Sequence, residues 1–227
     1  LKNEWNVASE KISIVYEGTH DQRLEGLTAP SNLPMPWAGK YIFTAGSLLP
    51  YRGLEDIINA LDILKKEGIE QNLVVAGSAP QGGQEYQQRM KRLADKCGLR
   101  DNIIWTDFLN QEQTGWCYAN CRCFVMSSRV ESFGHVALEA LSYGCLCIAA
   151  DNPCLPEIFQ DAALYYEPRD SHLLADRIKD ILTFDVEQKL VLSRAACGRA
   201  SEFSWDDTAQ RTVEALQAAI PMKCTGR

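Results

Sequence analysis

The sequence lacks the features of several protein classes. It carries 23 Lys and Arg against 30 Asp and Glu, a formal net charge of -7, so it has little positive charge with which to follow a nucleic-acid backbone. No stretch approaches the ~20 consecutive apolar residues of a membrane span, and the first residues lack the apolar core of a secretory signal peptide. What is present is ordinary: 46% of the 227 residues are apolar, which predicts a globular chain with one large core or two smaller ones.

The nine cysteines lack the grouping of a metal site. There is no Cys-x-x-Cys pair, and the three histidines are scattered, whereas a structural zinc site needs closely spaced ligands. An odd number of cysteines without a secretory signal favours free thiols in a reducing cytoplasm. Cys121 and Cys123, and likewise Cys145 and Cys147, are separated by one residue. On strands this spacing would place each pair on one face as small packing side chains.

Apolar periodicity predicts strands that alternate with helices over most of the chain. Between Gly18 and Lys40 the periodicity is lost and Pro and Gly gather, which predicts a long irregular connection. Continuous apolar strands alternating with helices are typical of a parallel sheet covered on both faces, so the expected fold is a doubly wound α/β domain. The expected strands are Ile12–Tyr16, Tyr41–Ala45, Leu73–Ala76, Asn102–Thr106, Cys123–Met126, Leu146–Ala150 and Ala163–Tyr166. The expected helices are Leu54–Glu67, Gln84–Cys97, Gln113–Asn120, Gly134–Tyr143, Leu173–Leu182, Val186–Ser201 and Asp206–Ile220.

The most informative string runs from Glu131 to Glu139, after the buried strand expected at Cys123–Met126. A helix that begins near Gly134 offers unpaired backbone N–H groups and the positive end of its dipole, which together bind anions. Side chains lean toward a helix N-terminus, so Glu139 reaches the cleft that Glu131 reaches from the loop. A phosphate site flanked by two carboxylates suits a ligand with a charged centre and hydroxyl groups on each side. Taken alone, the two glutamates could equally be an exposed helix residue and a partner of the dipole.

The residues around Glu131 and Glu139 are more informative than the spacing of the two glutamates. The string E-x-F-G-x-x-x-x-E-A, with its E-x7-E spacing, is joined by further stretches in a fixed order. From Tyr41 to about Leu182 the chain resembles the C-terminal, donor-binding domain of the retaining glycosyltransferases of family 4, which are two-domain enzymes of the GT-B fold. The resemblance implies a Rossmann-like domain with a doubly wound parallel sheet. The matching stretches are 45–53, 73–77, 131–144, 156–158 and 203–205.

The resemblance implies roles for particular residues. Glu131 matches a glutamate that contacts hydroxyl groups of the donor sugar near the reaction centre, and Glu139 matches one that holds the ribose of the nucleotide. Arg52 stands in the place of a lysine that neutralises the diphosphate, where a cation would stabilise the departing nucleoside diphosphate. Glu131 and Arg52 are therefore the expected catalytic residues. The expected donor-binding residues are Ser47, Arg52, Phe108 and Leu109 beside the base, Glu131, Ser132, the backbone of Phe133, Gly134, His135 and Val136, and Glu139.

Two departures from the family pattern affect these expectations. Ser47 stands where many members have a second basic residue, so neutralisation of the diphosphate depends more on Arg52, with Arg129 as the candidate for the second charge. Pro153 and Cys154 stand where two glycines are common. Their presence predicts an altered loop over the sugar and leaves the donor undefined.

The resemblance also implies the domain organisation. Residues 1–40 are expected to hold a strand near an interdomain linker and an irregular connection, residues 41–200 the nucleotide-sugar-binding domain, and residues 201–227 a helix that packs toward an N-terminal domain. The first residues resemble the end of the interdomain linker, so the N-terminal half is expected to be absent. A chain of this kind should bind the donor and transfer sugar poorly or not at all.

For the complete enzyme, the resemblance implies transfer of a hexose from a nucleotide-diphospho-sugar to an acceptor hydroxyl, with retention at the anomeric carbon. No metal or other cofactor is implied, because Arg52 and the helix dipole can supply the positive charge. The expected partners are the donor and a carbohydrate or glycolipid acceptor, in the cytoplasm at the inner face of a membrane. Two alternatives stay open: a non-catalytic nucleotide-sugar-binding module and a sugar-nucleotide epimerase of the GT-B fold.

Overall fold

The computed structural model describes residues 7–19 and 25–219. The chain divides into two compact units: Leu1–Asp21 with Ser201–Arg227, and Gln22–Ala200. The irregular connection expected within residues 1–40 is therefore shared between them. Its second part belongs to the larger unit, where Leu33 is buried and the Asn32 side-chain amide donates to the Trp105 carbonyl at 3.2 Å.

The larger unit is built on a six-stranded sheet in the order β3-β2-β1-β4-β5-β6, with every neighbouring pair parallel. The central strands carry the core: every residue of β4 and β5 is buried, because side chains on both faces of a parallel sheet are covered by helices. This confirms the predicted fold class. The strands are β1 Tyr41–Ala45, β2 Asn72–Ala76, β3 Ile103–Asp107, β4 Cys123–Met126, β5 Cys147–Ala150 and β6 Ala163–Tyr166.

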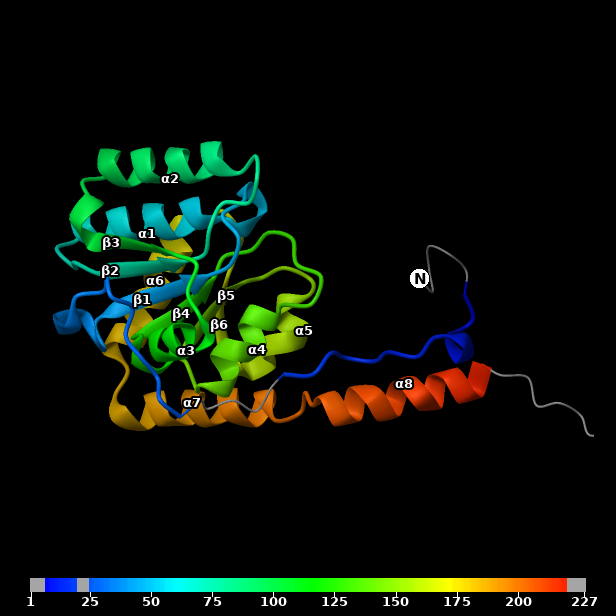
Figure 1. Cartoon of the computed structure of the whole chain (residues 1–227). Helices are drawn as coiled ribbons and strands as arrows, with labels where there is room; N and C mark the ends of the chain where they lie inside the picture. The colour runs from blue at the N-terminus through cyan, green and yellow to red at the C-terminus, as the bar shows by residue number, and fades with distance from the viewer. Residues whose placement is uncertain (1–6, 20–24, 220–227) are drawn as a thin grey trace, which may run out of the picture. The chain divides into compact units, whose positions relative to one another are not determined.

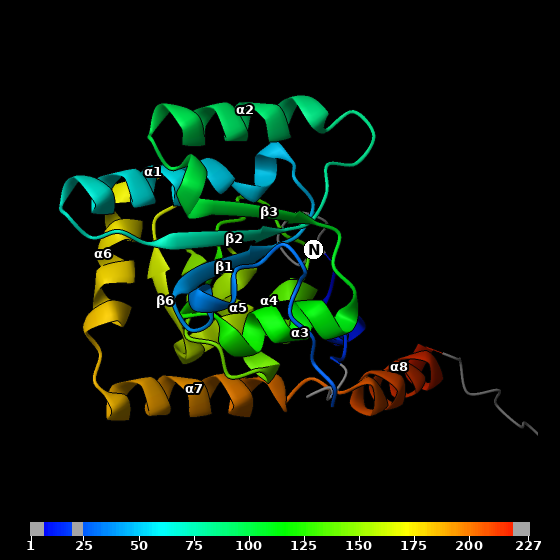
Figure 2. The same cartoon turned by 60° about the vertical axis from the view of Figure 1, so that its left-hand side comes forward.

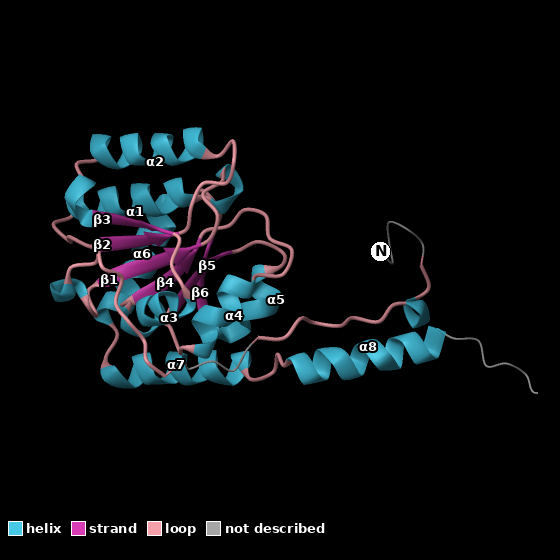
Figure 3. Cartoon of the chain, viewed as in Figure 1, coloured by secondary structure: helices cyan, strands magenta, loops and turns pink. Residues whose placement is uncertain are grey.

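Helices cover the sheet on both faces (Figure 1; Figure 3), with α1, α2 and α6 on one face and α3, α4, α5 and α7 on the other. Figure 2 shows the same two layers from a second direction. Strand β1 continues through α1 to β2 on one side, and β4 through α4 to β5 on the other, so the order of connection reverses between β1 and β4. The helices are α1 Leu54–Lys66, α2 Gln84–Lys96, α3 Gln111–Asn120, α4 His135–Ser142, α5 Leu155–Phe159, α6 Ser171–Thr183 and α7 Val186–Ala200.

Local chemistry accounts for the element boundaries. Helix α1 buries Ile57, Ile58 and Leu61 along one face, and burying such a side chain contributes about 1.5–3 kcal/mol. Helix α3 begins two residues earlier than predicted, because Asn110 and Gln113 form a capping box: the Gln113 N–H donates to the Asn110 side chain at 2.8 Å. Helix α5 was not predicted, since its five residues are too few to show a period.

The cysteines of this unit are free thiols, half of them buried and half of them partly buried. Only Cys123 and Cys147 of the two predicted pairs lie on strands, because Cys121 and Cys145 precede β4 and β5. The Cys121 thiol donates to Cys145 Sγ at 3.8 Å, which joins the two pairs at the N-terminal edge of the sheet. Burial raises the pKa of Cys117 to about 12, so this thiol is protonated at neutral pH.

The smaller unit contains α8, Trp205–Ala219. The strand predicted at Ile12–Tyr16 is wrong: no strand is assigned over this segment, and the bridge recorded among the unit's described residues joins Thr19 and Ser204. Alternating apolar residues indicate a strand, but a strand also needs a neighbouring strand with which to pair. The segment instead packs beside α8, where the Thr208 hydroxyl donates to the Tyr16 carbonyl at 2.7 Å.

Across residues 7–19 and 25–219, no helix is long and apolar enough to cross a membrane.

Candidate functional site

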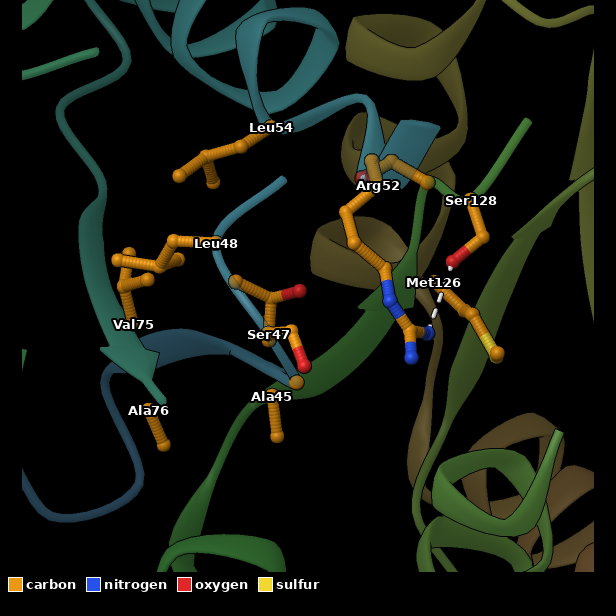
Figure 4. A pocket seen from close by; sticks show the side chains of 12 residues that line it. Ala45, Ser47, Leu48, Arg52, Leu54, Val75, Ala76, Met126 and Ser128 are labelled. Carbon is orange, nitrogen blue, oxygen red and sulfur yellow. Dashed lines mark hydrogen bonds between the residues drawn. The ribbon is translucent and has the colours of Figure 1, made fainter. Parts of the chain in front are cut away.

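The candidate site lies where the order of connection reverses, beyond the C-terminal ends of β1 and β4. Open parallel sheets bind ligands at this place. The loop after β1 and the loop after β4 form a small pocket there, which Figure 4 shows from close by. Its lining residues are Thr44, Ala45, Gly46, Ser47, Leu48, Arg52, Leu54, Val75, Ala76, Met126, Ser127 and Ser128. Ser47 and Arg52, both predicted from the sequence, are among them.

Arg52 supplies the positive charge of the pocket. It ends the 3-10 turn Pro50–Arg52, and its side chain extends toward Ser128 (Figure 4), with Nη1 donating to the Ser128 hydroxyl at 3.2 Å. The same Nη1 donates to Glu131 Oε2 at 2.6 Å, so the two expected catalytic residues form an ion pair. Arg52 Nε is buried and is one of two buried side-chain nitrogen atoms, among the described residues, without a hydrogen-bond partner. A buried N–H of a charged group is costly when it has no acceptor, and an anionic ligand oxygen would provide one.

The loop after β1 and the loop after β4 are in direct contact through their backbones. The Ser127 hydroxyl donates to the Arg52 carbonyl at 2.7 Å. Gly53 follows with φ 65°, and a Cβ at this position would lie 2.3 Å from the Ser127 carbonyl oxygen. Only glycine has both the conformation and the missing side chain that this approach needs. The position of Arg52 is therefore fixed by backbone contacts as well as by its ion pair.

Helix α4, which follows the loop that carries Glu131, contains Glu139. The helix follows Gly134, whose φ of 102° favours glycine. The Ala137 and Leu138 amides both donate to the Gly134 carbonyl, so the amides before them have no acceptor within the helix and form its positive end. Backbone of this kind is what the sequence predicts beside the pyrophosphate.

Glu139 is exposed as a residue, but its carboxyl group is largely removed from solvent beside Tyr118. The Tyr118 hydroxyl, from α3, donates to Glu139 Oε2 at 3.0 Å. Desolvation raises the pKa of Glu139, and this hydrogen bond lowers it again in part. Tyr118 is itself buried and packs edge-on against Phe43, so it is a rigid donor. Sequence reasoning missed Tyr118, because nothing in α3 indicates which residue its hydroxyl meets.

Several predicted donor-binding residues lie apart from the pocket. Phe108 and Leu109 follow β3, and Phe108 is 81% exposed, outside the lining. Ser132 and His135 are exposed in the loop and at the first turn of α4. The structure therefore brings together Ser47, Arg52 and Glu131 directly. The other predicted residues do not line the pocket; they lie in the loop after β3, in the loop between β4 and α4, and on α4: Phe108, Leu109, Ser132, Phe133, Gly134, His135, Val136 and Glu139.

Arg129, the candidate for the second phosphate-binding charge, is paired with two carboxylates in this structure. Its Nη1 donates to Glu55 Oε1 at 2.7 Å and its Nη2 to Asp56 Oδ1 at 2.8 Å, and it does not line the pocket. Asp56 is only 2% exposed. Removing one partner of a buried ion pair costs about 3–5 kcal/mol, so the two carboxylates hold the guanidinium in place. The sequence could not show this pairing, because the partners are more than 70 positions away.

Residues Asn152 and Cys154, which follow β5, contact the loop that carries Glu131. The Cys154 thiol donates to the Phe133 carbonyl at 3.1 Å. Burial, followed by the nearby Glu131 and Glu157 carboxylates, raises the pKa of Cys154 to about 11. The Asn152 side-chain amide donates to the Ser128 carbonyl. Asn152 and Cys154 thus tie the β5 loop to the loop that carries Glu131, which sequence reasoning did not foresee.

The fold and the pocket define a Rossmann-like α/β domain with a cationic site at its switch point. Residues 32–198 match the model of the family described as glycosyl transferases group 1. The match covers well over half of the chain, and the chain belongs to this family.

Individual relatives agree with this placement. The chain is 27% identical to the serotype-specific mannosyltransferase WbdA of Escherichia coli, over 85% of this chain and 23% of that protein. Among solved structures it is similar to sucrose-phosphate synthase from Thermosynechococcus elongatus, with a TM-score of 0.70, 27% identity and coverage of 82% and 46% of the two chains. The fold also matches Anabaena HepE in complex with UDP and glucose, with a TM-score of 0.71, 22% identity and coverage of 79% and 49%. The chain spans less than half the length of each of these three.

Proposed function

We propose that this chain is the donor-binding domain of a retaining hexosyltransferase, which transfers a hexose from a nucleotide-diphospho-sugar to an acceptor hydroxyl. The observation that carries the proposal is Arg52: a cation at the switch point with a buried Nε that lacks an acceptor, paired with Glu131. A diphosphate oxygen at Nε would complete its hydrogen bonding, and the amides at the start of α4, which begins at His135 shortly after Glu131, would receive further phosphate oxygens. Membership of the glycosyl transferases group 1 supports the reaction class.

Each residue has a separate task in this proposal. Arg52 neutralises the diphosphate and stabilises the charge that develops as the nucleoside diphosphate departs. Glu131, released from Arg52 by the diphosphate, accepts hydrogen bonds from hydroxyl groups of the sugar. Glu139, oriented by Tyr118, accepts from the two ribose hydroxyls, as an ionised carboxylate can. The charge on Arg52 and the amides of α4 serve in place of a metal ion.

For the acceptor, the proposal gives only a chemical class. WbdA is described as a serotype-specific mannosyltransferase, which supports the transferase class. That the acceptor is a carbohydrate or glycolipid, bound by a further domain, is part of the proposal. The chain alone would then bind the donor without efficient transfer.

Calorimetric titration of the chain with UDP, GDP and ADP tests the proposal. We expect saturable binding of one of the three, with a 1:1 stoichiometry and a weaker response to the other two. Inorganic phosphate should not compete at equal concentration, because it lacks the ribose. The Glu112→Ala variant, which removes an exposed glutamate from the first turn of α3, is the matched control and should bind normally. Failure of all three nucleotides to bind the folded chain would overturn the proposal.

A further inference from the structure

The structure ties the two loops of the site together through Arg129. This residue lies two positions before Glu131, in the loop after β4. Its backbone N–H donates to the Tyr51 carbonyl at 2.7 Å, and its Nη1 also approaches the Pro50 carbonyl at 3.4 Å. Both carbonyls belong to the turn that ends in Arg52. Arg129 thus contacts the Arg52 turn with its main chain and with its side chain.

The far end of the Arg129 side chain is anchored equally firmly. Asp56 accepts from Arg129 Nη2 with one carboxylate oxygen and from the Arg169 N–H, at 3.0 Å, with the other. Glu55 accepts from Arg129 Nη1 with one oxygen and from the Tyr86 hydroxyl, at 2.6 Å, with the other. These partners come from α1, α2 and the connection before α6, so Arg129 joins the site loops to the helical layer on one face of the sheet.

This arrangement has a consequence for Arg52. The Arg52 carbonyl is held by Ser127 and the preceding carbonyl by Arg129, so both contacts come from the loop that also carries Glu131. The guanidinium of Arg52 and the carboxylate of Glu131 can meet at 2.6 Å only while the two loops keep this spacing. A displacement of about 1 Å at a catalytic group is enough to impair its function.

We propose that Arg129 is a positioning residue, which holds the Arg52 turn against the Glu131 loop and so sets where Arg52 meets the diphosphate of the donor. This inference rests on the proposed function. It also assigns the two arginines of the site to different tasks: Arg52 contacts the ligand, and Arg129 contacts only protein.

A double-mutant cycle separates this role from direct phosphate binding. The readout is the ratio of dissociation constants for a nucleoside monophosphate and its diphosphate, measured by calorimetry with whichever of the UMP/UDP, GMP/GDP and AMP/ADP pairs binds. The ratio isolates what the second phosphate contributes. We expect Arg129→Met to lower the ratio roughly tenfold, and the Arg52→Met/Arg129→Met double variant to fall no lower than Arg52→Met alone, because the effects of coupled residues do not add.

Three results would overturn the inference. If the ratio in the double variant fell by the product of the two single-variant factors, Arg129 would bind phosphate independently of Arg52. An unchanged ratio in Arg129→Met, with both nucleotides weakened equally, would show a purely structural role. Full recovery of the ratio in Arg129→Lys would show that a single charge is enough, whereas positioning needs the fork that reaches two carboxylates.

The controls keep the outcomes distinct. Thermal unfolding of each variant establishes that it is folded. If Arg129→Met does not fold, Glu55→Gln takes its place: this variant weakens one of the two ion pairs of Arg129 and keeps Asp56, and it should lower the ratio severalfold. Arg100→Met, which breaks an exposed pair with Asp95, should leave the ratio unchanged. A wild-type chain that binds no diphosphate overturns the proposed function together with this inference. Normal binding with an unmoved ratio overturns this inference alone.

Discussion

The Arg52→Met variant is expected to bind nucleoside diphosphates roughly 100-fold more weakly than the wild-type chain. Hydrogen bonds to charged groups contribute about 1.5–3 kcal/mol, and each ~1.4 kcal/mol is a factor of ten in affinity. Arg52 offers the diphosphate its buried Nε and a charge. Its removal also leaves Glu131, whose side chain is 12% exposed, as an uncompensated negative charge facing the ligand.

Two controls accompany this measurement. Arg52→Lys keeps the charge and loses Nε, so we expect a loss of only a few-fold. The corresponding nucleoside, which carries no phosphate, should bind both Arg52 variants as it binds the wild type. If Arg52→Met bound the diphosphate with unchanged affinity, the pocket between β1 and β4 would not be the phosphate site.

The second large effect is expected at Glu139. The Glu139→Ala variant should lose roughly 30-fold in nucleoside diphosphate affinity, because the ribose hydroxyls lose a charged acceptor. The informative comparison uses the 2′-deoxynucleoside diphosphate. The wild type should prefer the ribonucleotide, while Glu139→Ala should bind both forms equally. Retention of the preference in the variant would place the ribose elsewhere.

The pH dependence of binding follows from the same residue. Only the ionised carboxylate accepts from both hydroxyls, and the pKa of Glu139 is raised by desolvation, with Tyr118 and His135 opposing the rise. Affinity should therefore fall as the pH drops through this pKa, which is raised from the ordinary value of a glutamate. Tyr118→Phe removes one of the groups that lower the pKa, so the fall should begin at a higher pH. Glu139→Ala should show no such step.

The sheet could be predicted from the sequence because its strands are short apolar runs, and the central ones are buried on both faces. Cys123–Met126 and Ala163–Tyr166 were predicted with the boundaries that the structure shows, since a short apolar run between polar loops has few alternative limits. The segment Ile12–Tyr16 has a similar pattern and forms no strand, because pairing depends on a neighbour that a local pattern does not reveal.

The site residues could be predicted where their position directly after a strand determines where they lie. Arg52 and Glu131 follow strands that lie side by side, so strand order alone brings them together at the switch point. Arg129 follows β4 as well, but its place in the chain did not indicate its ion pairs, because the direction of its side chain depends on Glu55 and Asp56 in another element. The same limit explains why Tyr118 was missed.

The central claim is that a donor diphosphate lies between Arg52 and the N-terminus of α4, with its ribose on Glu139. A crystal structure of the chain with the nucleoside diphosphate that binds tests this most directly. We predict a phosphate oxygen within hydrogen-bond distance of Arg52 Nε, both ribose hydroxyls on the Glu139 carboxylate, and Glu131 released from Arg52. A nucleotide bound away from the switch point, or one with Arg52 still paired only to Glu131, would contradict the account.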